Sequence, residues 1–481
     1  MRKIFLTLAL IVGFVPMINA QWTSPGDGVY YFLKELVGIS NGTVTQEQGD
    51  FFINADLTIS ENDVLVIHDD VLNIIVRDAL ITIKGSMVCD NNMQVNVKGE
   101  PSFRFLFENA TNCNIKNIDF SQGSGLKLIS SGVSFENCSF VNQNTEVNNA
   151  AVNFFMCSPV FENCTFIANE GAAISSAANN QGSPKILNCT FERNVTSNTN
   201  MPQINLGPGS MFDSIYIVGN TIIGGSNMSG GIAVADLMGT GSTTVLLKDN
   251  VVRNNRYGYN QQGNSISSLI QGNDFVDNNL ETNPMNGGSG ISIYGSSANC
   301  KAKLRNNKIT GNLWGITAIN LNDIDMGTEN DWGYNMIYEN SNNGILYELY
   351  NNSSCDIMAV GNWWGTVDEQ KVEELIVHKN DDPALGLVTF LPIWKDDDVN
   401  EVAALNAVIA PNPVSNGILI VTLAEAISAE VSVYDLFGRK LKSQIIENEM
   451  NTINVESLES GVYFVEVRSG DSKTVQKVVI E

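Results

Sequence analysis

The chain contains 481 residues with a formal net charge of −25, and 43% of its residues are hydrophobic. This apolar content is too high for a disordered chain, and the length allows more than one domain. The strong negative charge argues against partners such as nucleic acid or anionic membrane surfaces, because both would repel the chain.

Residues 1–20, MRKIFLTLALIVGFVPMINA, have the composition of a signal peptide. Arg2 and Lys3 form a basic start, an apolar stretch follows, and we expect cleavage between Ala20 and Gln21. A membrane anchor is the competing interpretation, but the apolar stretch is short for a bilayer span and polar sequence follows it. Because no later segment reads as transmembrane, the sequence predicts an exported protein.

The middle of the chain is built from a short repeat. Clear copies are FENCSF (135–140), FENCTF (161–166) and LNCTF (187–191), and later copies such as LRNNKI (304–309) replace Cys by Asn. Alternating apolar residues broken by Asn and Gly predict short strands that stack as the coils of a solenoid. The sixth position of the copies should point into the core: Phe120, Phe140, Phe166, Phe191, Ile222, Val252, Phe275, Ile309, Ile337 and Trp364.

The fourth position of the repeat carries Asn or Cys. We expect the Asn side chains to form a ladder of hydrogen-bonded amides from coil to coil, through Asn220, Asn250, Asn273, Asn307, Asn335 and Asn362. Cys138, Cys164 and Cys189 occupy the same position, where stacked thiols would serve as small apolar filler. Disulfides between coils are the alternative, whereas zinc is disfavoured because His68 and His378 are the only histidines.

These repeat units resemble the right-handed parallel β-helix proteins of the pectin-lyase-like superfamily, over roughly residues 50–366. The resemblance implies an all-β fold, a right-handed parallel β-helix solenoid, for which we expect the bounds 21–395. After the last coil, Thr366 and Glu369 read as a capping box and an apolar stripe follows. A capping helix near 367–378 should therefore cover the open end of the solenoid, which would otherwise be an exposed sheet edge.

The C-terminal segment has a different pattern. Residues 396–407 read as a linker, and alternating strands are expected at 417–423, 429–436, 461–470 and 473–480. Strands of this length separated by turn residues predict a small C-terminal β-sandwich.

Four motifs in this segment resemble the C-terminal sorting domain of the type IX secretion system. They are Pro411-Asn412-Pro413, VYDLFGRKL (433–441) with Gly438, LESGVYFVEV (458–467) with Gly461 and Tyr463, and KVVIE (477–481) with Lys477. The resemblance implies a sorting domain over 408–481 that is recognised by the type IX secretion machinery. It also implies transit through the periplasm, followed by release outside the cell or attachment to the outer-membrane surface.

Two classes of function compete for the solenoid. One is glycan binding or adhesion without catalysis, and the alternative is a polysaccharide lyase or glycoside hydrolase of the superfamily. The Gly-His-Gly segment of the superfamily's hydrolases is absent from the sequence. A lyase needs a base, for which the candidates Arg253, Arg256, Arg305 and Lys308 read equally well as solvated surface residues.

Aromatic residues in the second half are candidates for stacking on sugar rings, namely Trp314, Trp363, Tyr257 and Tyr259. The repeat register points Trp364 into the core and its neighbour Trp363 outward. Acidic residues Asp323, Asp325 and Asp331 are candidates for binding calcium, although their spacing is not that of an EF-hand. No other cofactor is expected, and we favour a surface protein that binds a polysaccharide or another glycan without catalysis.

Overall fold

The computed structural model describes residues 21–68, 70–144, 149–225, 228–239, 242–281, 283, 286–395, 407–424, 426–435, 440–469 and 472–480. These residues form two compact units, one ending at Trp394 and the other starting at Lys395. The signal peptide expected at 1–20 and nearly all of the linker expected at 396–407 lie outside the described residues. No described helix is long and apolar enough to cross a lipid bilayer.

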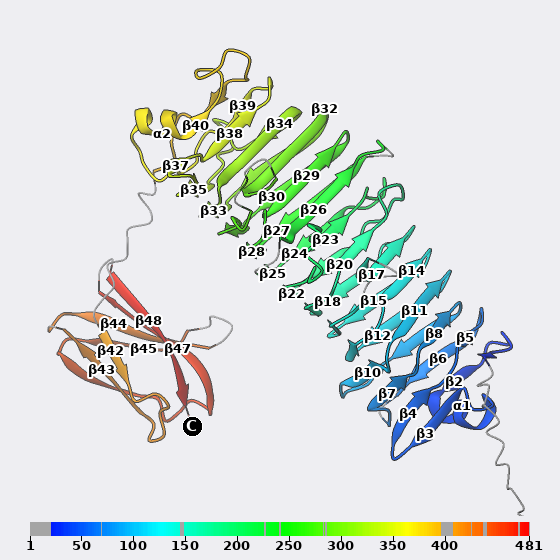
Figure 1. Cartoon of the computed structure of the whole chain (residues 1–481). Helices are drawn as coiled ribbons and strands as arrows, with labels where there is room; N and C mark the ends of the chain where they lie inside the picture. Colours follow the sequence, from blue (N-terminus) through cyan, green and yellow to red (C-terminus); the bar gives the residue numbers. More distant parts are fainter. Residues whose placement is uncertain are drawn as a thin grey trace, which may run out of the picture. The chain divides into compact units, whose positions relative to one another are not determined.

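The first unit is a parallel β-helix in which successive coils stack from the blue to the yellow end of the chain (Figure 1). Each coil crosses three faces, and the strands of each face pair in parallel with those of the next coil, apart from one antiparallel hairpin on the third face, Val44–Glu47 with Asp50–Ile53. The all-β solenoid predicted from the repeat is therefore confirmed. Parallel sheets expose few edges when coils cover one another, and here the remaining edges lie only at the two ends.

The first face comprises β1 (Trp22–Thr23), β5 (Leu57–Ile59), β8 (Ala79–Ile83), β11 (Phe103–Glu108), β14 (Leu126–Ile129), β17 (Ala150–Phe155), β20 (Ala172–Ser176), β23 (Pro202–Leu206), β26 (Gly230–Asp236), β29 (Tyr259–Gly263), β32 (Ser289–Arg305), β34 (Trp314–Asp325), β38 (Leu349–Asn352) and β40 (Ile376–Val377). The second face comprises β2 (Tyr30–Phe32), β6 (Val64–Ile67), β9 (Ser86–Cys89), β12 (Cys113–Lys116), β15 (Val133–Glu136), β18 (Val160–Glu162), β21 (Lys185–Leu187), β24 (Ile215–Val218), β27 (Thr243–Lys248), β30 (Ile266–Gln271), β39 (Ile357–Met358) and β41 (Val388–Thr389). The long strands β32 and β34 belong to both faces, because they turn the corner between them without a break.

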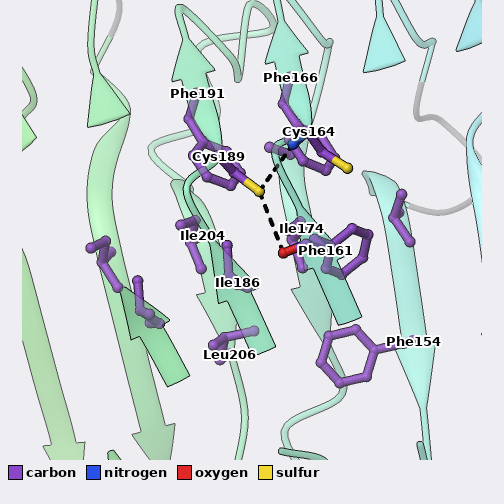
Figure 2. Close-up of a cluster of buried hydrophobic side chains, with 14 of the residues drawn as sticks. Phe154, Phe161, Cys164, Phe166, Ile174, Ile186, Cys189, Phe191, Ile204 and Leu206 are labelled. Atoms are coloured by element: carbon purple, nitrogen blue, oxygen red, sulfur yellow. Dashed lines mark hydrogen bonds between the residues drawn. The ribbon is translucent and has the colours of Figure 1, made fainter. Parts of the chain in front are cut away.

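The third face comprises β3 (Val44–Glu47), β4 (Asp50–Ile53), β7 (Asn73–Val76), β10 (Val95–Gly99), β13 (Ile118–Ser121), β16 (Ser139–Val141), β19 (Thr165–Ile167), β22 (Thr190–Glu192), β25 (Thr221–Ile223), β28 (Val251–Arg253), β31 (Asp274–Val276), β33 (Lys308–Thr310) and β35 (Met336–Tyr338). The sixth positions of the repeat lie here, and all ten side chains are buried. Phe140, Phe166 and Phe191 stack in one column, with ring centroids 4.7 and 4.9 Å apart. Figure 2 shows Phe166 and Phe191 of this column. Such stacking adds to the stabilisation from burial alone.

Side-chain amides form a ladder at the corner between the second and third faces. The Nδ2 of Asn220 donates to the Oδ1 of Asn250 at 2.9 Å, and the same bond recurs from coil to coil as far as Asn362. Each amide also bonds to main-chain groups of the neighbouring coils, as Asn220 does to the carbonyl of Ile186. Amides that would otherwise be buried without partners are thereby satisfied.

A second ladder follows the corner between the third and first faces. It contains Asn169, Asn194, Gln203, Asn255, Asn278, Asn312 and Asn340. It ends on a carboxyl group, because the Nδ2 of Asn340 donates to the Oε2 of Glu348 at 2.5 Å. Burial raises the pKa of Glu348 to about 7, although the hydrogen bonds from Asn340 oppose this shift.

Cys138, Cys164 and Cys189 are buried, and the N–H of Cys189 donates to the Oδ1 of Asn220, the first amide of the ladder, at 2.8 Å. Cys164 and Cys189 lie in adjacent coils (Figure 2). All eight cysteines are free thiols. The Sγ of Cys189 accepts a hydrogen bond from the backbone N–H of Cys164 at 3.4 Å. Burial raises the pKa of the Cys89 and Cys113 thiols to about 11, so these groups remain protonated and behave as small apolar side chains.

A short helix lies near each end of the first unit: α1 (Leu33–Ile39), which the sequence analysis did not anticipate, and α2 (Glu369–Leu375). The expectation that Thr366 starts the second helix is wrong. Asp368 is the N-cap, and its carboxylate accepts from the N–H groups of Gln370 and Lys371. Val372 of α2 packs into the core, and the helix ends three residues before the predicted limit because the chain returns to strand at β40.

The second unit is built from two small antiparallel sheets. One contains β42 (Ala407–Ala410), β43 (Ile418–Leu423) and β46 (Met450–Asn454), and the other β44 (Ala429–Tyr434), β45 (Lys440–Ile446), β47 (Gly461–Ser469) and β48 (Ser472–Ile480). Valine and isoleucine side chains from both sheets share one core. All four strands expected from the sequence are present, and β42, β45 and β46 complete the sandwich.

Candidate functional site

A hollow of about 450 Å³ lies on the outer side of the first face, over β29, β32, β34 and β38. Three of the candidate residues line it: Arg256, Tyr257 and Trp314. We call this site the aromatic hollow. Besides these three residues, it is defined by Asn260, Ser292, Thr317, Tyr350 and Asn352.

The floor of the aromatic hollow is a row of outward side chains in register. Asn260 pairs with Ser292, Ser292 with Thr317, and Thr317 with Tyr350. Because neighbouring parallel strands lie about 4.8 Å apart, these four residues present a regular line of amide, hydroxyl and phenol groups. The hydroxyl groups of Ser289 and Thr317, 2.9 Å apart, join adjacent coils beside the row.

Aromatic rings form one end of the hollow. The rings of Trp314 and Tyr350 come from adjacent coils and are nearly parallel, at 21°, with centroids 6.2 Å apart. Tyr347 packs edge-on against both rings. All three rings are only partly buried, so ring surface remains available beside the polar row.

Arg256 and Tyr257 form the opposite wall. The guanidinium of Arg256 donates to the carbonyls of Asn286 and Asn200, at 2.7 and 2.6 Å, and so ties together loops from different coils. It lies over the Tyr257 ring, 5.0 Å from the centroid. No carboxylate among the described residues pairs with Arg256. Burial raises the pKa of Tyr257 to about 12, although Arg256 opposes this shift.

The backbone under Tyr257 is held close to its ring. A Cβ placed on Gly230 would lie 2.3 Å from Cζ of Tyr257, so any other residue at this position would displace the ring. Gly230 therefore fixes the depth at which the phenol sits in the wall of the hollow.

The remaining base candidates lie elsewhere. Arg253 is exposed on β28 and Lys308 is half-buried on β33, both on the third face, so neither reaches the aromatic hollow. Arg305 is buried and donates to both Asp325 and Asp331, each at 2.8 Å. These pairings neutralise the guanidinium within the fold, which makes Arg305 a structural residue.

The acidic candidates for calcium are each paired with a basic side chain. Asp323 bonds to Lys301 at 3.0 Å, and Asp331 bonds to Lys303 and Arg305. Hydrogen bonds from Arg305 and Lys303 hold the pKa of Asp331 well below its usual range. Cations already occupy the positions from which these carboxylates would bind a metal, and the described residues contain no cluster of three or more metal-binding side chains.

Two aromatic candidates do not join the hollow. Tyr259 is fully buried, and its hydroxyl bonds to Ser268 inside the solenoid, so a surface ligand has no access to the ring. Trp363 is half-buried beside β35, where its backbone pairs with Asn335 and Ile337. That position is on the third face, whereas the hollow is on the first.

The two histidines are not equivalent. His68 is exposed, as expected for a surface residue. His378, in contrast, is only 1% exposed. Its Nε2 lies 2.9 Å from the Oε1 of Glu373, and its Nδ1 accepts from the N–H of Val388. His378 therefore fastens the segment after α2 to β41 and has a structural role.

In the second unit, the side chain of Asn412 is hydrogen-bonded to the main chain of the last strand, β48. Asn412 donates from Nδ2 to the carbonyl of Lys477 at 2.8 Å and accepts at Oδ1 from the N–H of Val479 at 2.9 Å. Residues 408–481 match the family model described as a secretion system C-terminal sorting domain. The chain ends in a secretion sorting domain. The protein is accordingly secreted by the type IX system to the cell surface or the extracellular space.

Other motif residues of the sorting domain also have structural roles. The hydroxyl of Tyr463 donates to the carbonyl of Glu459 at 2.7 Å, which closes the turn before β47. Gly461 opens β47 opposite Ile480, and the side chain of Lys477 is exposed. Gly438 lies outside the described residues. Pro411 and Pro413 flank Asn412, so the Pro-Asn-Pro motif presents the side chain that secures the last strand.

The first unit also resembles known proteins. A family model described as a protein of unknown function (DUF1565) matches residues 258–370, a range that includes Trp314 and Tyr350. No curated protein matches the chain. A mutant of the periplasmic alginate epimerase AlgG is similar in structure, with 12% identity and a TM-score of 0.48 over 76% of this chain and 83% of that chain. The receptor-binding domain of the siphovirus 9NA tailspike matches with 8% identity and a TM-score of 0.31 over 89% and 94% of the two chains.

The polar row of the hollow was not predicted from the sequence. The sequence feature that could have revealed this row is a Gly that recurs before a strand. Asn260, Ser292 and Thr317 each lie two residues after such a Gly. The next Gly of this kind in the sequence is Gly344, but Gly344 lies in the hairpin of β36 (Ser341–Asn342) and β37 (Ile345–Leu346). Glu348 takes the equivalent place, because Ile316 pairs with Leu349, and Tyr350 then falls in the row.

Proposed function

We propose that the β-helix is a glycan-binding module without catalytic activity, which the sorting domain delivers to the cell surface or the extracellular space. The observation that carries this proposal is the pair of nearly parallel rings, Trp314 and Tyr350, beside a row of uncharged polar groups. Aromatic faces pack on the apolar faces of sugar rings, and amides and hydroxyls bond to sugar hydroxyls. The volume of about 450 Å³ suits a small number of sugar rings.

The ionisable groups of the hollow favour binding over chemistry. Every lining residue among those described is aromatic, aliphatic, Gly, amide or hydroxyl, apart from Arg256. General acid–base catalysis needs a group with a pKa near the working pH. Tyr257, with a pKa near 12, stays protonated, and a guanidinium stays charged. The alternative, a polysaccharide lyase or hydrolase, would have to use Tyr257 or Arg256 as its base.

The proposal is tested with the exported protein on an array of neutral and acidic polysaccharides, with and without calcium. We expect retention on at least one glycan. Trp314→Ala and Tyr350→Ala should each weaken that binding about tenfold or more, because a stacking surface is lost. Trp363→Ala is the matched control, since it removes a half-buried indole on another face and should leave affinity unchanged.

Turnover is measured in the same samples. Unsaturated products and new reducing ends should stay at the level of the blank during prolonged incubation. Release of either product by the wild type, lost in Arg256→Ala, would replace the binding proposal with the enzymatic alternative. An array on which nothing is retained and from which no product is released would exclude both functions for the glycans tested.

A further inference from the structure

A second hollow adjoins the aromatic hollow on the first face. It has a volume of about 580 Å³ and is lined by Ser296, Asn320, Leu321, Asn352, Ser354 and Ala384, among others. We call it the polar hollow. It lies where β32, β34 and β38 leave the first face, beside the loop that follows α2.

The two hollows are continuous. Asn352 lines both of them, and Ile319 of the aromatic hollow is followed directly by Asn320 of the polar hollow. Ile319 and Asn352 are also partners across β34 and β38. From Trp314 to Asn320 the single strand β34 advances roughly 20 Å, at about 3.3 Å per residue. The path is therefore longer than one sugar ring.

The walls of the polar hollow are preformed. The N–H of Gly386 donates to the carbonyl of Ser353 at 2.8 Å, and the Nδ2 of Asn351 donates to the carbonyls of Cys355 and Gly386. These bonds fix the loop that carries Ala384 against the end of β38. A ligand meeting this surface would not have to order it first, which reduces the entropic cost of binding.

The polar hollow offers uncharged groups to a ligand. The side chains of Asn320 and Asn352 are exposed, and neither amide makes a hydrogen bond within the described residues. The Asp382 carboxylate lies beside the hollow, because it accepts from the N–H of Ala384. Together with the net charge of −25, this carboxylate disfavours an anionic ligand in the polar hollow. The cation of the aromatic hollow, Arg256, already donates to two carbonyls and lies over the Tyr257 ring.

We infer that the ligand is an uncharged oligosaccharide that lies along β34 over both hollows, and this inference rests on the proposed glycan-binding function. One part of the chain stacks on Trp314 and Tyr350. The next part bonds to the amides of Asn352 and Asn320. A single sugar or a disaccharide fills the aromatic hollow alone.

The test is a calorimetric titration of the full chain with cello-, xylo- and manno-oligosaccharides, from disaccharide to octasaccharide, and with oligogalacturonates of the same lengths. For at least one neutral series, affinity should rise about tenfold or more between the disaccharide and the longest member. The acidic series should bind more weakly at every length. Ala384→Trp should abolish the gain with length, because the indole fills the polar hollow, while disaccharide affinity stays unchanged.

Lys379→Trp is the matched control, since it adds the same bulk to the same loop at an exposed position that does not line the hollow. It should preserve the gain with length. A gain that survives Ala384→Trp, equal affinities for all lengths, or tighter binding of the acidic series would overturn the inference while leaving glycan binding intact. Absence of binding to every series would instead remove the proposed function and the inference together.

Discussion

Trp363 and Trp364 show how one residue step separates two roles. Trp364 lies in the sixth position of the last copy, is only 1% exposed, and belongs to the core of the first unit. Trp363 carries the adjacent outward position and is half-buried. Because strand side chains alternate between faces, the pair cannot form a shared platform for a sugar.

We expect Trp364→Ala to lower the free energy of unfolding by about 3–5 kcal/mol, the range for removing a buried aromatic side chain. Equilibrium denaturation in urea measures this change. Trp363→Ala should cost less than half as much. Trp364→Phe should be mild, because the buried Nε1 of Trp364 has no hydrogen-bond partner to lose within the described residues. Equal losses for Trp363→Ala and Trp364→Ala would contradict the assigned register.

The ladders are the elements whose contribution is easiest to isolate. Asn273 donates to the carbonyls of Leu247 and Gln271 and to the Oδ1 of Asn307, and it accepts from the amide of Asn250. Removing it leaves several buried polar groups without partners, at about 1–3 kcal/mol for each. Its loss should therefore affect the coils on both sides.

Asn273→Ala should lower the free energy of unfolding by roughly 3 kcal/mol, as measured by chemical denaturation. Asn273→Cys should be better tolerated, since Cys164 and Cys189 occupy the same place in other coils. The control Asn320→Ala, at an exposed amide, should have almost no effect. A small effect of Asn273→Ala would mean that water replaces the missing amide.

Glu348 makes the end of the second ladder sensitive to pH. Its pKa in the folded protein is about 7, above the ordinary value of 4.5, so the folded state holds a proton that the unfolded state has lost. Stability from this group is therefore fully present below about pH 4.5 and declines as the pH rises to about 7.

Glu348→Gln should remove that decline and raise the free energy of unfolding above pH 7 by roughly 2–3 kcal/mol. Gln203 shows that the ladder accepts a glutamine, because its Oε1 takes the hydrogen bond from Asn194 at 2.8 Å. Denaturation at a series of pH values provides the measurement. A variant with the same pH profile as the wild type would exclude Glu348 as the titrating group.

For the whole molecule, the sorting domain determines where the β-helix acts. A chain lacking residues 408–481 should accumulate in the periplasm, whereas the full chain should reach the cell surface or the medium. Cell fractionation with immunoblotting distinguishes these outcomes. Lys477→Ala is the control and should have little effect on secretion. Asn412 donates to the main-chain carbonyl of Lys477, whereas the side chain of Lys477 is exposed. Secretion of the truncated chain would mean that the β-helix carries an independent export signal.

The β-helix could be predicted from the sequence because the repeated residues are those whose side chains point into the core of the solenoid. Inward residues such as Phe140 and Phe166 face one another in adjacent coils, so packing forces them to be alike. The same argument gave the amide ladder and the core position of Trp364.

The site was predicted only in part, because outward residues are free to differ. Arg256, Tyr257 and Trp314 were candidates on chemical grounds, whereas Tyr350 entered the row only through the pairing of β34 with β38. The hairpin of β36 and β37 shifted the apparent repeat by four residues and hid that pairing. The ion pairs of Arg305 could not be recognised from the sequence, because its partners Asp325 and Asp331 come from the following coil.

The ladders also have a direction. Within the first ladder, each amide donates to the amide of the coil that follows it in the chain and accepts from the amide of the coil before it. The coils between Asn220 and Asn362 thus present the same two complementary surfaces to their neighbours. A gene segment encoding one coil could be duplicated or lost without leaving an amide unmatched, so the reach of the binding face can change in steps of one coil while the two ends stay the same.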